Sequence, residues 1–396
     1  MVKTPIYFDH AATTPVDKRV LDKMLPYFSD VFGNPNSQHV FGREAVKAVD
    51  EARDTIASLI NARPHEVYFT SGGTESDNWA IRGIAHAYGD KGKHIIISPI
   101  EHAAMITTAK ALEKEGFKVD FMKVDSEGFV DLNHLRSIIT DDTIFVGCMV
   151  ANNEIGTIEP IKEIAEIAHE KGAFMFADAV QAAGVLKLDV KELGVDLMSM
   201  SSHKIYGPKG MGALYIRNGV KLTSIITGGH QERMKRGGTT NVPAVVGFAE
   251  AFRIANEELE KNFEYVSSLR DRFIDKVLKE VPYVKLNGPK KEHRLPANAD
   301  FSFEYIEGES ILFSLDLAGI AVSSGSACSS GSLEPSHVLL AIGLPEELAH
   351  GSIRFSFGKH NTIEEIDYAV DCLKAAVLKL RKMSPLFKIE GEIKNV

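Results

Sequence analysis

The stretch VDLMSMSSHKIYGPKGMG, residues 195–212, is the most informative part of this sequence. Its first six residues form an apolar run that predicts a short buried strand, and Lys204 follows just past the end of that strand. The glycines and the proline of residues 207–212 then predict a tight turn. Such an arrangement holds an amine at a fixed point beside room for a flat ligand. A lysine in an ordinary surface turn is the simpler alternative.

A carboxylate at the end of a second predicted strand favours the functional interpretation. The run AFMFAD, residues 173–178, ends in Asp178, and Gln181 follows three residues later. An amine and a carboxylate at two strand ends can hold opposite ends of one heterocycle. Pyridoxal 5′-phosphate needs this pair, because a lysine binds its aldehyde and an acidic residue pairs with its pyridinium nitrogen. The sequence therefore indicates pyridoxal phosphate as the cofactor.

The residues around these two strands predict an α/β fold. From about residue 65 to 217, short β-rich runs alternate with helical stretches; the predicted strands are residues 67–70, 94–97, 119–124, 143–150, 173–177, 195–200 and 212–216, and the predicted helices are residues 74–88, 102–115 and 161–171. This alternation is typical of a mainly parallel sheet covered by helices. Ligands of such sheets bind beyond the carboxyl ends of the strands, where the candidate residues lie.

The rest of the chain predicts a second, smaller α+β domain. Residues 250–281 read as long helices that lead into it, and it contains a strand near residues 300–303, a helix near 310–317 and a closing helix at 363–381. We place the large cofactor-binding domain at residues 15–259 and the small domain at residues 1–14 and 260–396.

Composition excludes several classes of protein. The chain has 396 residues, 44% of them hydrophobic, and a net charge of −9 without a basic run, which argues against a nucleic-acid partner. No apolar run approaches the roughly 20 residues needed to span a bilayer, and the N-terminus lacks the apolar core of a signal peptide. Three cysteines, far apart and odd in number, argue against a disulfide framework. We therefore expect a cytoplasmic protein without a membrane partner.

Several further residues are candidates for the site, each with a simpler alternative. In TSGGTES, residues 70–76, the backbone of Gly73 and Thr74 suits a phosphate at a helix N-terminus, although Thr74 with Glu75 also suits a plain helix cap. His102 lies between a strand and a helix, where it could stack on a cofactor ring or serve as a capping residue. The fourteen histidines show no metal-ligand spacing, so we expect no resident metal.

Two more residues are candidates for binding the substrate, and a basic loop is a candidate for binding an anion. Asn153, in NNEIGT, follows a strand and can offer an amide to a ligand, or belong to an ordinary turn. Arg354 alternates with apolar residues as on a strand; its guanidinium suits a carboxylate, or an internal salt bridge. Residues 233–240, RMKRGGTT, could complete an anion site.

Cys328 differs from the other two cysteines. Cys148 lies in a predicted strand and Cys372 in an apolar helix, where free thiols are usually buried and inert. Cys328 lies in SSGSACSSGS, residues 323–332, whose six serines and two glycines cannot build a core. The sequence therefore predicts a solvent-accessible, mobile loop with a functional thiol.

Together these motifs resemble the cysteine desulfurases of the NifS/IscS type, which belong to the fold-type I pyridoxal-phosphate enzymes. The resemblance runs from YFDHAATTP near the start to SPLF near residue 387, and SSGSAC is its most discriminating part. It implies a large domain with a seven-stranded, mainly parallel sheet and a homodimer. It also implies that the enzyme converts L-cysteine to L-alanine and leaves the sulfur as a persulfide on Cys328.

The resemblance implies a role for each candidate residue. Lys204 would bind the cofactor aldehyde and later move protons, with His102 stacked on the ring and active in acid–base steps. The other implied cofactor contacts are Asp178 to the pyridinium nitrogen, Gln181 to the phenolic oxygen, Asn153 to the cofactor and substrate, Gly73, Thr74, Ser201 and His203 to the phosphate, and Thr239 to the phosphate of the neighbouring subunit. Arg354 would bind the substrate carboxylate.

The sulfur acceptor implied by the resemblance is an iron–sulfur cluster scaffold protein, in whose complex Cys328 would contact a cluster. After SPLF the sequence has only nine more residues, fewer than the housekeeping members of the family, which leaves other acceptors open. An aminotransferase or a lyase acting on selenocysteine would be an alternative with the same cofactor. A catalytically silent scaffold is an alternative of another class, and it predicts a colourless protein.

Overall fold

The computed structural model describes residues 2–324, 334–385 and 387. Cys328, the predicted nucleophile, lies outside the described residues.

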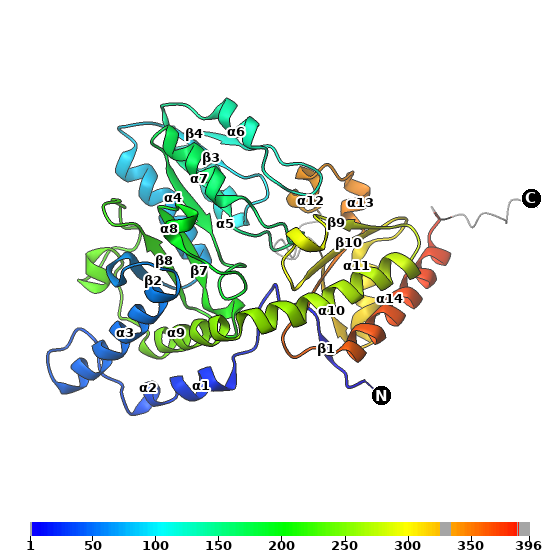
Figure 1. The fold of residues 1–396 in the computed structure, drawn as a ribbon, viewed down its shortest axis with the longest axis horizontal. Coiled ribbons are helices and arrows are strands. Elements are labelled where there is room, and N and C mark those ends of the chain that lie inside the picture. Colours follow the sequence, from blue (N-terminus) through cyan, green and yellow to red (C-terminus); the bar gives the residue numbers. More distant parts are fainter. Residues whose placement is uncertain (1, 325–333, 386, 388–396) are drawn as a thin grey trace, which may run out of the picture.

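A seven-stranded sheet forms the centre of the larger half of the molecule (Figure 1). Its strands run in the order β2-β8-β7-β6-β5-β3-β4. Their bounds are β2 Val67–Thr70, β3 His94–Ile97, β4 Lys118–Phe121, β5 Thr143–Met149, β6 Phe174–Asp178, β7 Leu197–Ser201 and β8 Gly212–Ile216. All neighbours pair in parallel except β8, which is antiparallel to both β2 and β7. The mainly parallel sheet is therefore confirmed.

Helices cover both faces of this sheet, which explains its continuous hydrophobic strands. In β3, Ile96 packs into the core that contains α3 Val40–Leu59, α7 Ile161–Glu170 and α9 Val242–Glu257, while its neighbours Ile95 and Ile97 pack into the core on the opposite face. The helices of that second core are α4 Gly73–Tyr88 and α5 Ala103–Glu113. Because successive side chains point to opposite faces, a strand covered on both sides is apolar throughout.

The smaller half is built around an antiparallel sheet of four strands in the order β12-β13-β10-β9. Its strands are β9 Val284–Asn287, β10 Asn298–Phe303, β12 Ser323–Ser324 and β13 Ser352–Ser356; a separate parallel pair joins β1 Ile6–Tyr7 to β11 Ile320–Ala321. Its helices are α10 Leu259–Glu280, α11 Gly308–Leu317, α12 His337–Ala341, α13 Glu346–His350 and α14 Ile363–Met383.

Short elements complete the described chain. The small helices are α1 Lys18–Met24, α2 Pro26–Ser29, α6 Leu132–Ile138 and α8 Val190–Leu193, and the 3₁₀ turns are η1 Pro64–Glu66, η2 Ser202–Lys204, η3 Gln231–Met234 and η4 Lys291–His293. The 20-residue helix α3 has no counterpart in the sequence predictions. Its buried residues recur at helical spacing, at Ala45, Ala48, Val49, Ala52 and Ile56, so this amphipathic pattern could have signalled the helix.

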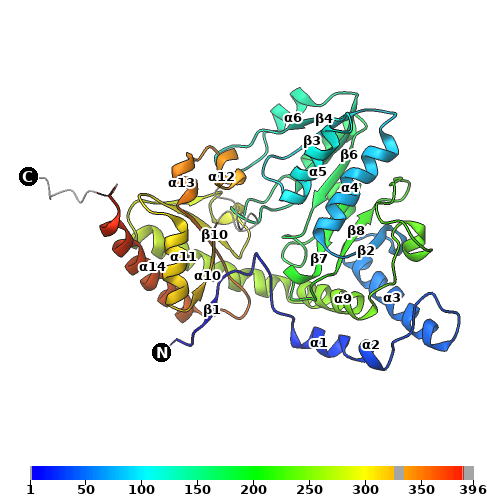
Figure 2. The same cartoon turned by 180° about the vertical axis from the view of Figure 1, so that it is seen from behind.

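Two segments join the halves of the molecule. Helix α10 begins beside α9 and runs along the small domain, and the N-terminal segment crosses from β1 in the small domain to α1 under the large one (Figures 1 and 2). Ile6 and Phe8 pack in the core of the small domain with α10 and α14. The boundaries at residues 15–259 and at 1–14 with 260–396 stay a prediction, which these separate cores support.

Candidate active site

One cavity lies at the carboxyl ends of the central strands. It is lined by Gly73, Thr74, Asp77, His102, Met149, Asn153, Asp178, Val180 and Gln181. These residues follow or end β2, β3, β5 and β6. Because parallel strands end at one edge of a sheet, chain segments that are a hundred residues apart meet there. Six of the candidate residues from the sequence line this single cavity.

The start of α4 forms one end of the cavity. The preceding residue, Gly72, has a φ of 151°, a conformation that favours glycine, and no side chain caps the first turn. The N–H groups of this turn are therefore left for a ligand, with the positive end of the helix dipole behind them. Ser201 Oγ is buried nearby and has no hydrogen-bond partner among the described residues. Such a set of donors fits a phosphate group.

Asp178 ends β6 and is 4% exposed. Its Oδ1 accepts a hydrogen bond from the backbone N–H of Val180 at 2.8 Å. Burial raises the pKa of Asp178, while that backbone bond and the charges of His102 and Lys204 oppose the rise. A buried carboxyl of this kind is completed by a cationic N–H partner, which the pyridinium of pyridoxal phosphate provides.

His102 caps a helix, while its stacking on a cofactor ring stays a prediction. It is the N-cap residue of α5, where its Nδ1 accepts a hydrogen bond from the N–H of Ala104 at 3.1 Å, and it also lines the cavity. With Nδ1 engaged as an acceptor, a neutral ring carries its proton on Nε2. Burial lowers the pKa of His102, and the nearby Asp178 opposes this effect. The ring is therefore held in place by the helix start.

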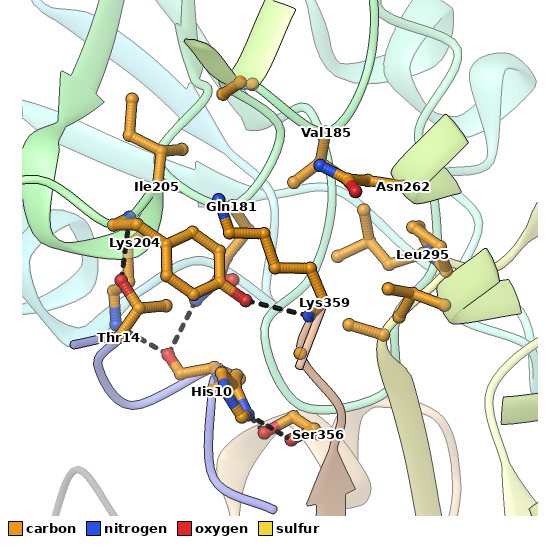
Figure 3. A pocket seen from close by; sticks show the side chains of 18 of the residues that line it. His10, Thr14, Gln181, Val185, Lys204, Ile205, Asn262, Leu295, Ser356 and Lys359 are labelled. Atoms are coloured by element: carbon orange, nitrogen blue, oxygen red, sulfur yellow. Dashed lines mark hydrogen bonds between the residues drawn. The ribbon is translucent and has the colours of Figure 1, made fainter. Parts of the chain in front are cut away.

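Lys204 ends the 3₁₀ turn η2 that follows β7, as the sequence indicated. Its Nζ donates to the carbonyl oxygens of Ala11 at 2.6 Å and Ala12 at 2.8 Å, and Gln181 Nε2 donates to Ala11 O at 3.0 Å. Lys204, Gln181 and Asn153 line a second cavity that adjoins the first (Figure 3). The N-terminal segment is thus part of the site.

His203 contacts the same N-terminal segment. Its Nδ1 lies 3.1 Å from Thr13 Oγ1, and its backbone carbonyl accepts a hydrogen bond from the hydroxyl of Thr14 at 2.9 Å. Burial, with the charge of Lys204, lowers the pKa of His203 to about 4. His203 is therefore neutral at physiological pH.

Arg354 comes from the small domain and reaches the large one. It lies on β13 with 2% exposure; its Nη1 donates to the carbonyl oxygen of Asn153 at 3.1 Å, and its Nη2 pairs with Asp9 Oδ1 at 3.0 Å. Its Nε is buried without a hydrogen-bond partner among the described residues. The internal salt bridge weighed from the sequence is present, and the side chain also reaches the backbone of a residue that lines the cofactor cavity.

Two residues of the cavity region escaped the sequence predictions. Asp77 is 1% exposed, and burial together with the charge of Asp178 raises its pKa well above the usual range. It lies four residues after Gly73 on α4, so the helical spacing places both on one face and could have signalled it. Asp9 is the second, and its partner Arg354 is too distant in sequence for any local pattern to reveal it.

The basic loop near residue 236 does not reach the cavity in this chain. Thr239 is exposed and lines neither cavity. Arg236 forms a two-pronged ion pair with Glu75 at 2.9 and 3.0 Å, and Arg233 donates to the carbonyl oxygen of Val67 at 2.9 Å. These two guanidinium groups are therefore engaged with protein atoms.

Comparisons with known proteins agree with this geometry. The family described as aminotransferase class-V matches residues 6–369. Cysteine desulfurase IscS of Clostridium botulinum is 53% identical over 391 residues, 98% of each chain, and that of Dictyoglomus turgidum is 52% identical over 392 residues, 99% of each. No helix among the described residues is long and apolar enough to cross a membrane.

Solved structures show the same likeness. A NifS-like protein, 39% identical, superposes with a TM-score of 0.89 over 95% of this chain and 100% of its own. The structure named SspA in complex with cysteine is 34% identical, with a TM-score of 0.80 over 90% of this chain and 100% of its own. The chain belongs to the class-V aminotransferase family, whose cofactor is pyridoxal phosphate, and within that family to the cysteine desulfurases.

Proposed function

We propose that this chain transfers the sulfur of L-cysteine to the thiol of Cys328, which releases L-alanine. The observation that carries the proposal is the meeting of Asp178, His102 and Lys204 at one strand edge, within reach of Arg354 from the second domain. A lysine, a ring-nitrogen partner and a stacking histidine serve the cofactor, while the buried guanidinium serves an amino-acid carboxylate.

The cofactor is held through both of its ends. The first turn of α4 at Gly73 and Thr74, with Ser201 and His203, binds the phosphate, and Asp178 pairs with the ring nitrogen. Gln181 bonds the phenolic oxygen, and Lys204 binds the aldehyde. Bound there, pyridoxal phosphate supplies an electron-accepting ring that stabilises negative charge at the α-carbon of an amino acid.

The other residues handle the substrate and its protons. Arg354 binds the carboxylate of L-cysteine, and Asn153 orients the substrate beside the ring. Lys204, once its amine is released, removes the α-proton and later returns a proton during alanine formation. His102 is neutral because burial lowers its pKa, and with Nδ1 accepting from Ala104 the proton on its Nε2 is the one it can donate toward the substrate.

Sulfur transfer itself needs a thiolate at Cys328. The Cys328 sulfur attacks the substrate sulfur; a sulfur–sulfur bond forms as the carbon–sulfur bond breaks, and the electron pair of that bond remains on the former cysteine carbon. Protonation of this carbon gives L-alanine, and Cys328 is left as a persulfide. No external oxidant or reductant is required, because one carbon–sulfur bond is exchanged for one sulfur–sulfur bond.

Mass spectrometry of the holoenzyme after mixing with L-cysteine tests this proposal. We expect one added sulfur atom on the peptide that contains Cys328, and none in Cys328→Ala, whose visible cofactor band stays intact. Formation of 3-mercaptopyruvate without alanine would favour the aminotransferase alternative. Full sulfur release by Cys328→Ala would contradict the proposed mechanism.

We also propose that the active form is a homodimer in which Thr239 serves the neighbouring phosphate site. Thr239 is exposed and lines neither cavity of its own chain. Exposed apolar side chains gather on and near α1, α2 and the start of α3: Leu21, Leu25, Phe28, Phe32 and Phe41. Mixed dimers of Lys204→Ala with Thr239→Ala subunits should regain cofactor-dependent activity, because one of their two sites is intact. Absence of this rescue would contradict a shared site.

The persulfide is then passed to an acceptor. We propose an iron–sulfur scaffold protein, in whose complex Cys328 contacts the growing cluster, and a cytoplasmic location, where thiols stay reduced. Transfer of labelled sulfur from the persulfide to a purified scaffold, in competition with a small thiol, tests this assignment. Equal transfer to an unrelated thiol protein would contradict a dedicated acceptor.

A further inference from the structure

The helix that follows residues 325–333 is packed on the cofactor-binding domain. Residues of α12, α13 and the loop between them share a small apolar core with residues of the large domain: Ile100, Met149, Ile155, Val338, Leu339, Ile342, Leu344 and Ala349. The three large-domain members lie beside His102 or Asn153, or end β5. Helix α12 is remote in sequence from the loops that contain His102 and Asn153. Through this shared core it nevertheless forms part of the rim of the active site.

Two polar contacts fix the beginning of α12 to the same loops. Ser336 Oγ donates to Glu154 Oε2 at 2.5 Å, and His337 Nε2 lies 2.9 Å from the carbonyl oxygen of Glu101. Glu154 is adjacent in sequence to Asn153, and Glu101 to His102. Ser336 is also the N-cap residue of α12, since its Oγ accepts a hydrogen bond from the N–H of Val338 at 3.2 Å.

The chain before residue 325 is held on the sheet of the small domain. In the antiparallel pair β12–β13, Ser323 lies opposite Arg354 and Ser324 lies opposite Ile353. On one side of segment 325–333 the described chain thus pairs with Arg354, and on the other side it contacts Glu154, which follows Asn153 in the sequence.

Glu154 is a buried residue that connects the start of α12 to the loop that contains Asn153. It is 6% exposed; its carbonyl oxygen accepts a hydrogen bond from Asn298 Nδ2 at 2.7 Å, and its N–H donates to Asn152 Oδ1 at 2.8 Å. The charged groups near its carboxyl are Arg354 on β13 and Asp300 on β10. A buried carboxyl with one side-chain donor depends strongly on that donor.

We propose that Glu154 and Ser336 are positioning residues for sulfur transfer, because their contact holds the chain that follows Cys328 at the rim of the substrate pocket. The inference rests on the proposed role of Cys328. It separates two functions of the site: the cofactor and substrate are bound by the residues described above, while the contact of Glu154 with Ser336 acts on the rate of sulfur transfer.

A single-turnover experiment tests the positioning role of Glu154 and Ser336. It measures the rate of persulfide formation in the holoenzyme by mass spectrometry. Ser336→Ala should lower this rate about tenfold, since the buried Glu154 carboxyl group loses its side-chain hydrogen-bond donor. Its visible cofactor band and its KM for L-cysteine should change less than about twofold. Ser336→Thr, which keeps the hydroxyl, should restore the rate to within about twofold of the wild type.

A double-mutant cycle separates the contact from the capping role of Ser336. In a Glu154→Gln background, Ser336→Ala should cost only about twofold, because the carboxyl group that Ser336 contacts is already gone. If Ser336→Ala does not fold, Glu154→Gln alone decides: we expect about a tenfold slower persulfide formation with an intact cofactor band.

Glu159→Gln is the matched control. Glu159 is also a buried carboxyl, 5% exposed, but its Oε2 accepts from the N–H of Val130 instead of from α12. Its persulfide rate should stay within about twofold of the wild type. An unchanged rate in Ser336→Ala, an equal penalty in both backgrounds, or an equal loss in Glu159→Gln would overturn the inference. Absence of persulfide in the wild type would instead overturn the proposed function.

Discussion

At the scale of single residues, burial keeps His10 beside the site in its neutral form. His10 precedes the two carbonyl groups that receive Lys204, and its Nδ1 lies 3.1 Å from the carbonyl oxygen of Ser356. Burial lowers the pKa of His10 to about 4. A histidine that is neutral when folded but charged when unfolded links the stability of the protein to pH.

The first prediction concerns this linkage. Between pH 6.5 and about 4 the unfolded chain binds a proton at His10 that the folded chain does not, so stability falls as the pH falls. The wild type should lose on the order of 2 kcal/mol between pH 7 and pH 5 through this group. His10→Gln, which cannot be charged, should lose that much less. Urea unfolding at the two pH values measures the difference, and an identical pH dependence in both proteins would contradict it.

The second prediction concerns Arg354. Lysine keeps the positive charge but not the fork that reaches Asp9 and Asn153 O together. Arg354→Lys should therefore raise the KM for L-cysteine roughly tenfold, with a smaller effect on kcat, if the guanidinium binds the substrate carboxylate. Steady-state kinetics measure both constants. A fall in kcat with an unchanged KM would assign Arg354 a purely structural role.

At the scale of elements, the start of α4 is shaped by what surrounds it. A Cβ on Gly73 would lie 2.7 Å from Val180 Cγ2, which is inside van der Waals contact. The helix start and Val180, the second residue after Asp178, are thus packed as closely as the side chain allows. Any side chain there would push α4 away from the strand end that carries the ring-nitrogen partner.

The third prediction follows from this close approach. Gly73→Ala should weaken cofactor binding about tenfold, because relief of the overlap displaces the phosphate-binding turn. Removal of the opposing methyl groups in Gly73→Ala/Val180→Ala should restore most of the affinity. Titration of the apoprotein with pyridoxal phosphate, followed by absorbance, measures both variants. Equal weakening in the single and the double variant would contradict the steric explanation.

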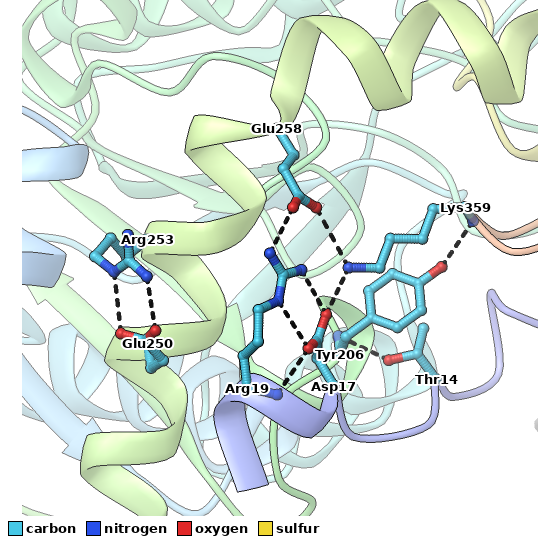
Figure 4. Close-up of polar contacts among 8 residues, drawn as sticks. All are labelled: Thr14, Asp17, Arg19, Tyr206, Glu250, Arg253, Glu258 and Lys359. Atoms are coloured by element: carbon cyan, nitrogen blue, oxygen red, sulfur yellow. Dashed lines mark hydrogen bonds and ion pairs between the residues drawn. The ribbon is translucent and has the colours of Figure 1, made fainter. Parts of the chain in front are cut away.

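At the scale of the whole molecule, one ion cluster joins three separate parts of the chain (Figure 4). Asp17, the N-cap of α1, pairs with Lys359 of the small domain at 2.8 Å and with Arg19 at 2.8 Å; Glu258, between α9 and α10, pairs with Arg19 at 2.6 Å. These contacts hold the pKa of Glu258 at about 2. Lys359 also lies 4.6 Å above the ring of Tyr206, two residues after Lys204.

The fourth prediction concerns this connection between the domains. The Lys359 side chain is 9% exposed, so Lys359→Gln should lower the free energy of unfolding by about 2 kcal/mol. Lys374→Gln is the control: its pair with Glu280 is 43% exposed on the lysine side, and the loss should stay under about 0.5 kcal/mol. Denaturant unfolding compares the two. Equal losses would show that the cluster adds no more than a surface ion pair.

Much of the fold could be predicted from the sequence. The runs at residues 67–70, 94–97 and 212–216 coincide with β2, β3 and β8, because a strand buried on both faces is apolar without interruption. The prediction of β4 ran to residue 124 where the strand ends at Phe121, since the apolar pattern continues past the paired residues. Helix α3 was missed although its buried residues recur at helical spacing.

The sequence by itself determined which chemistry is available: a lysine and an aspartate at strand ends, glycines before a helix, and a cysteine among serines. Only the tertiary structure decided which groups meet. Arg354 reaches the carbonyl of Asn153, and Ser336 reaches Glu154, across nearly two hundred residues. Local propensity is set by neighbouring residues, whereas these contacts arise when separate elements pack together, so no local pattern in the chain encodes them.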